Sequence, residues 1–147
     1  MINWLQRDCS ISASTEELGR LRSISTAAVE GVLIEAYRQG PPPELERNYT
    51  SAFVNAFDQR VEALAREGSR LLSADDAARL QAIDRDSYVR RRLDSALLNY
   101  RTNAVAGLGL VKSRGALPLL NEIAGEASNP MREAARTALQ ELSDGRR

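Results

Sequence analysis

The sequence predicts an all-α protein, and three observations lead to this fold class. Apolar residues recur at three- and four-residue spacing along most of the chain, which is the period of an amphipathic helix. The sequence has no alternating run of β-branched and aromatic residues, and aromatic residues make up only 5% of it. A length of 147 residues suits one domain. We therefore expect a single all-helical domain over residues 1–147, built from antiparallel helical pairs.

Two helices are predicted before the first prolines. Ser14 and Glu17 have capping-box spacing, which predicts a short helix over residues 14–22. A continuous apolar stripe predicts a second helix over residues 25–39. Gly40 should end this helix, and the three prolines that follow prevent its continuation.

The middle of the chain is expected to hold one long helix followed by two others. Residues 44–66 carry six large apolar side chains on one side, so a long helix is expected there and Gly68 should close it. A short helix that includes Leu80 and Ile83 follows, and the next helix covers residues 86–100.

Acidic residues stand at the starts of these two helices. Asp75, Asp76, Asp84 and Asp86 could in principle hold Mg²⁺ or Ca²⁺, but the glycine and terminal glutamate of a helix-loop-helix calcium site are missing at the required spacing. We interpret them, with Ser73, as N-terminal caps, because an acceptor at this position satisfies free amides and the helix dipole.

The last third of the chain contains a self-match at a spacing of 31 residues. Residues 101–111 align with residues 132–142, and both segments begin with arginine and place alanine and leucine at matching positions. Between them, residues 114–126 (RGALPLLNEIAGE) form a second helix face. Asn129 can cap the last helix and Pro130 can open it.

The boundary between the helices over 86–100 and 101–111 is weakly marked, because the apolar spacing continues and no glycine precedes Gly107. We place a break at residues 99–103.

Gly107 and Gly109 resemble a phosphate-binding loop only superficially, since the second glycine of that motif is missing and no strand precedes it. Because a glycine inside a helix costs up to about 1 kcal/mol relative to alanine, we expect both to allow a close helix approach.

The order of helix, turn, antiparallel helix, Asn-Pro loop and new helix over residues 101–142 resembles the HEAT-like repeats of bacterial proteins, the short variety also found in phycobilisome lyases. The resemblance implies an α-solenoid or a short helical-repeat bundle. Only about one and a half repeats are visible, and stacked repeats usually need about three. Residues 14–100 are therefore expected to supply degenerate pairs, such as 25–39 with 44–66. An unfinished repeat end would also favour self-association.

The residues that are absent exclude several classes of function. The chain has no histidine, which excludes Ser-His and Cys-His nucleophiles, histidine metal ligands and a histidine general base. Cys9 is the only cysteine, so we assign it a surface or packing role. No enzyme activity, cofactor or metal is predicted. We expect a cytoplasmic protein outside the membrane, because the start is not a signal peptide and the longest apolar stretch, residues 104–111, is too short for a span.

Charge is balanced overall and uneven locally. The 20 cations equal the 20 anions, which removes the global positive field of a typical phosphate-gripping protein. Residues 68–115 hold nine cations against five anions. Three consecutive arginines are spaced about 100° apart around a helix and span about 200°, so they cannot form one flat patch and a solvated helix face is the competing interpretation. The candidate anion-binding residues are Arg90, Arg91, Arg92 and Lys112, with Arg114 nearby.

We weigh two main functions. The first is a non-enzymatic protein-interaction or scaffold module, and the HEAT-like resemblance implies a concave binding surface that includes Arg114, Asn121 and Glu122. The alternative is a nucleic-acid or anion binder that uses the Arg90–Arg92 region. The missing histidines disfavour a third interpretation, an enzyme subunit or lyase-like chaperone, which would rest on fold analogy alone.

Overall fold

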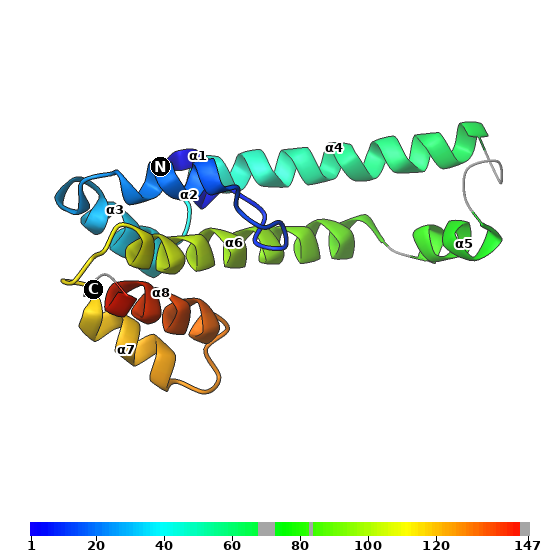
Figure 1. The fold of residues 1–147 in the computed structure, drawn as a ribbon. Helices are drawn as coiled ribbons and strands as arrows, with labels where there is room; N and C mark the ends of the chain where they lie inside the picture. The colour runs from blue at the N-terminus through cyan, green and yellow to red at the C-terminus, as the bar shows by residue number, and fades with distance from the viewer. Residues whose placement is uncertain (68–72, 83, 145–147) are drawn as a thin grey trace. The chain divides into compact units, whose positions relative to one another are not determined.

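The computed structural model describes residues 1–67, 73–82 and 84–144, and within them it contains helices and no strand, which confirms the all-α class. Figure 1 shows the helices in chain order. The described helices are α1 (Ile2–Leu5), α2 (Thr15–Arg22), α3 (Thr26–Gln39), α4 (Pro43–Glu67), α5 (Ala74–Ala82), α6 (Arg85–Leu110), α7 (Leu117–Gly125) and α8 (Arg132–Asp144).

The helices belong to two compact units. Unit 1 comprises Met1–Pro41 and Leu97–Arg147, and unit 2 comprises Pro42–Ala96. Unit 2 is therefore inserted in the sequence of unit 1, and α6 contributes residues to both units. The expected antiparallel pair of residues 25–39 and 44–66 corresponds to α3 and α4. Because α3 belongs to unit 1 and α4 to unit 2, this pairing stays a prediction.

The local signals at the first helices have the predicted effects. The Ser14 hydroxyl accepts a hydrogen bond from the Glu17 amide, and the Glu17 carboxylate accepts one from the Ser14 amide, which completes the capping box of α2. Gly40 ends α3 with φ +76°, a backbone conformation that residues other than glycine rarely adopt. Gly68 and Ile83 lie outside the described residues, so their predicted roles stay predictions.

The predicted break at residues 99–103 is wrong, because α6 is continuous from Arg85 to Leu110. The helix ends later, with Lys112 at φ +56° and two hydrogen bonds, from the Ser113 amide to the Leu108 carbonyl and from the Lys112 amide to the Gly109 carbonyl. These are the two bonds of a Schellman motif, here with lysine at the left-handed position.

The two glycines of α6 allow close packing in unit 1, as predicted. A Cβ added to Gly109 would lie 2.5 Å from the Ala138 Cα of α8, a distance that forces the two backbones apart. A Cβ added to Gly107 would lie 3.1 Å from both Leu33 and Trp4. Small residues therefore set the separation between α6 and its neighbours.

Unit 1 buries its core around the second half of α6. The α7 and α8 helices lie side by side and run antiparallel, joined by a short loop that contains Asn129 and Pro130 (Figure 1). The Asn129 side chain accepts a hydrogen bond from the Met131 amide just before α8, as its predicted capping role requires. The fully buried large side chains of this core are Leu33, Val105, Leu108, Ser113, Leu120 and Ile123.

Unit 2 is a helical hairpin of α4 and the first half of α6, with α5 packed on α4. Phe57 lies against Tyr88, with ring centroids 5.3 Å apart, and Phe53 lies under the Arg92 guanidinium. Residues later in α4 thus meet residues earlier in α6, so the two helices run antiparallel. Among the described side chains of unit 2, Tyr88 alone is buried.

Candidate functional site

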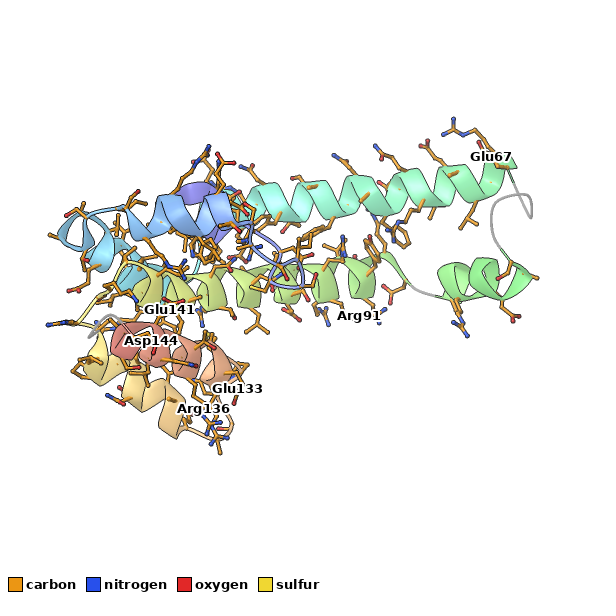
Figure 2. All side chains as sticks on the ribbon, in the orientation of Figure 1. Glu67, Arg91, Glu133, Arg136, Glu141 and Asp144 are labelled. Carbon is orange, nitrogen blue, oxygen red and sulfur yellow. The ribbon has the colours of Figure 1, made fainter. Side chains whose placement is uncertain are left out.

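The three consecutive arginines do not form one patch. Arg90 and Arg91 are exposed, and Figure 2 shows Arg91 on the side of α6 turned away from α4. Arg92 points the other way, with its guanidinium carbon 5.4 Å from the centre of the Phe53 ring. This divergence agrees with the wide angular spread expected of three consecutive helical residues.

A hollow of about 460 Å³ lies beside the start of α6, lined by Ala82, Asp84, Ser87, Arg90 and Arg91. Asp84 caps the helix by accepting hydrogen bonds from the Ser87 amide and hydroxyl, as predicted. Hydrogen bonds from Ser87, with smaller help from Arg90, hold the pKa of the Asp84 carboxyl below its ordinary value. An ionised carboxylate thus shares this hollow with the two arginines and weakens its attraction for an anion.

Lys112 and Arg114 belong to unit 1, whereas Arg90, Arg91 and Arg92 belong to unit 2. The Lys112 ammonium is engaged, since it donates to the Glu141 backbone carbonyl and to the Glu141 carboxylate. Neither unit by itself contains the complete set of predicted anion-binding cations.

Glu141 links α2, the end of α6 and α8 within unit 1. Its carboxylate lies 2.9 Å from Arg22 and 3.2 Å from Lys112. Desolvation opposes ionisation there, but the hydrogen bonds from Arg22 and Lys112 outweigh it and hold the pKa of Glu141 below its ordinary value. Figure 2 shows Glu141 on α8, on the side toward α6. This cluster joins three elements of unit 1 and gives Lys112 a structural role.

The predicted partner-binding residues Arg114, Asn121 and Glu122 are all exposed in unit 1. The Asn121 side chain donates to the Leu117 carbonyl one turn earlier in α7, which is a local contact. The three residues are therefore accessible to a partner.

A site that the sequence did not reveal surrounds Asn103, which is 3% exposed. Its side-chain amide donates to the Leu5 and Arg7 carbonyls, and its backbone carbonyl accepts from the Trp4 indole at 2.7 Å. The Cys9 thiol donates to the Asn103 Oδ1. Asn103 therefore fastens the N-terminal segment to α6, and the signal in the sequence was a polar residue inside the apolar stripe of that helix.

Cys9 takes its environment from this cluster. Desolvation raises the pKa of the Cys9 thiol by more than the nearby Arg7 lowers it. A thiol with a raised pKa is a poor nucleophile at neutral pH, and this supports the surface or packing role predicted for Cys9, which is exposed. In the described part of the chain, no group of three or more histidine, cysteine or acidic residues is placed to hold a metal ion.

The most distinctive surface lies on the hairpin of unit 2. Over its whole described length of 25 residues, α4 has no buried residue. At about 100° per residue, its large apolar side chains spread over roughly 180°, which is wider than the stripe of about 100° that faces one neighbour. Val61, on this arc, is 46% exposed.

We define the hairpin face as Val54 and Val61 of α4 with Val89 and Leu93 of α6. At about 100° per residue, the two valines of α4 lie roughly 60–80° to one side of the positions that contact α6. Val89 and Leu93 lie roughly 80–120° from the α6 positions that contact α4. Because the helices run antiparallel, both pairs fall on the same side of the hairpin. Val54, Val89 and Leu93 are only half-buried.

The chain matches no family model, no curated protein and no solved structure. The HEAT-like assignment of residues 101–142 therefore stays a prediction. No helix in the described residues has the length and apolar character needed to cross a membrane.

Proposed function

We propose that this protein is a non-enzymatic protein-interaction module that binds a helical surface of its partner through the hairpin face. The observation that carries the proposal is a 25-residue amphipathic helix without a single buried residue. An amphipathic helix gains most of its stability from packing of its apolar face. We therefore expect α4 to pack against a further surface, supplied by a partner.

The chemistry of the hairpin face supports protein binding. Its members are aliphatic side chains on a helical frame, and an apolar centre with a polar rim is the usual anatomy of a protein interface. Helix-in-groove recognition uses apolar residues at the same three- and four-residue spacing. The polar surface formed by Arg114, which precedes α7, and by Asn121 and Glu122 of α7 is a second candidate for protein contact.

The alternative function, nucleic-acid or anion binding, has less support from the geometry. Arg90 and Arg91 share their hollow with Asp84, Arg92 covers Phe53, and Lys112 binds Glu141. If phosphate contacts dominated, the affinity for a single-stranded oligonucleotide would fall steeply with salt and would be lost in the Arg90→Ala/Arg91→Ala variant. That result would favour the alternative.

The proposal is tested with a photo-crosslinking amino acid at position 61 in cells of the native source. We expect covalent protein adducts from position 61, with a second copy or with another protein. Asn55 is exposed on the same helix, roughly 120° from Val61 in the polar arc, and provides the matched control site. Equal protein adducts from positions 61 and 55, or none from position 61, would overturn the proposal.

A further inference from the structure

We propose that the partner of the hairpin face is a second copy of this chain, so that two hairpins form an antiparallel four-helix assembly. This inference rests on the proposed function and names the partner of the same surface. In the assembly, α4 of one copy lies on the first half of α6 of the other copy. Three properties of unit 2 lead to it.

The first property is that a two-helix hairpin cannot cover its own apolar surface. The aromatic contacts between α4 and α6 involve Phe53, Phe57 and Tyr88, and they use the side of each helix that faces the other. Val61, at 46% exposure, and the half-buried Val54, Val89 and Leu93 remain beside that contact. If two hairpins lie face to face, these residues are buried at the centre of a four-helix bundle, where apolar side chains normally lie.

The second property is charge complementarity between the two helices of the hairpin. The α4 helix carries five acidic and three basic residues, a net charge of −2. Residues 85–96 of α6 carry four basic and two acidic residues, a net charge of +2. One cation and one anion of these, Arg85 and Asp58, already form an ion pair within the copy, which leaves −1 on α4 and +1 on residues 85–96. Two α4 helices side by side would therefore repel, whereas α4 on the partner's α6 brings opposite charges together.

A two-fold axis makes this contact twice. If α4 of one copy contacts α6 of its partner, the symmetry also places the partner's α4 on α6 of the first copy. An unrelated partner would need to match both a negative and a positive helix.

The third property is the available area. At 1.5 Å per residue α4 is about 37 Å long, residues 85–96 of α6 are about 18 Å long, and each helix is about 10 Å wide. One side of the hairpin therefore offers on the order of 550 Å² per copy, the size of a weak interface that dissociates on dilution.

The experiment is sedimentation velocity on the full chain over a wide concentration range. We expect a species of twice the 16.2 kDa chain mass that dissociates on dilution. The Val61→Glu substitution should raise the dissociation constant by about tenfold or more, because it buries an unpaired carboxylate in the interface. The Asn55→Glu substitution adds the same charge in the polar arc of α4 and should leave the constant unchanged. Circular dichroism checks that both variants keep the helical content of the unmodified chain.

Crosslinking tests the arrangement within the dimer. A photo-crosslinker at position 61, in a mixture of isotopically light and heavy chains, should give adducts between copies that map to residues 85–96. Adducts that map to α4 of the other copy would overturn the proposed arrangement.

Two other results would overturn the dimer itself, namely a chain that stays monomeric at every concentration and a dimer that Val61→Glu leaves intact. In either case, heterologous protein adducts from position 61 in cells would still support the proposed function, so failure of the inference is distinguishable from failure of that function.

Discussion

Unit 1 and unit 2 are built from amphipathic helices, yet they differ in what their apolar residues contact. All but one of the buried apolar residues of the described chain belong to unit 1, and the exception is Tyr88. The second half of α6 is surrounded by α1, α3 and α8, which contribute Trp4, Leu33 and Ala138. By contrast, α4 contacts the first half of α6 and α5 within unit 2.

The comparison shows that the width of an apolar arc does not determine burial. An arc is buried only when enough neighbouring elements surround it, and within unit 2 the neighbours of the long α4 are one half of α6 and the short α5. Unit 1 has the layers that a core needs. Unit 2 keeps its surplus apolar surface for a partner, under the function proposed above.

The largest effect is expected from Leu108→Ala in unit 1. Leu108 is fully buried, and the substitution should lower the free energy of unfolding by about 3 kcal/mol through lost burial and a residual cavity. Leu98→Ala in the same helix is the matched control, because Leu98 is 41% exposed and should cost less than about 1 kcal/mol. Urea denaturation measures both values. Equal losses would contradict the assignment of the core to the second half of α6.

A smaller loss is expected from Gly109→Ala. The new methyl group would overlap the α8 backbone at Ala138, so the helices must separate, at a cost of about 2 kcal/mol. Gly31→Ala in α3 is the control, since no atom lies within 4 Å of the added methyl group there. That variant should gain up to about 1 kcal/mol from helix propensity. Thermal unfolding distinguishes the opposite signs, and a stabilising Gly109→Ala would refute the close approach.

The smallest effect, and the one with reversed sign, is expected from Tyr88→Phe in unit 2. The Tyr88 hydroxyl is buried and has no hydrogen-bond partner among the described residues. Removing it relieves an unsatisfied polar group, so the free energy of unfolding should rise by about 1 kcal/mol. Tyr88→Leu is the control, because it also removes the ring contact with Phe57 and should destabilise the hairpin. A loss of stability in Tyr88→Phe would show that the hydroxyl is bonded in solution.

Local signals in the sequence predicted the fold class and most helix ends. The capping box at Ser14 and Glu17, the turn at Gly40 and the acidic cap at Asp84 depend on residues a few positions apart, so they can be recognised without a structure. The close approach of α6 and α8 was also predictable, because a helical glycine needs compensation. The identity of its partner, Ala138, was not.

The features that sequence reasoning missed depend on distant residues. Asn103 was placed in a helix break, whereas its side chain binds the carbonyls of Leu5 and Arg7, nearly a hundred positions earlier. With these partners Asn103 has no need to disturb the helix, so α6 continues through it. The division into two units depends likewise on how residues 1–41 meet residues 97–147, and neither periodicity nor composition reveals such contacts.

The insertion of unit 2 into unit 1 has a consequence for protein engineering. The position of a Gly40 Cβ would lie 3.3 Å from the Arg101 side chain, so the two points where the hairpin leaves and rejoins unit 1 are close. Chains tolerate insertion and excision best where the joined ends are near each other at the surface. A short linker in place of residues 42–96 is therefore expected to leave a smaller protein that folds with its own core.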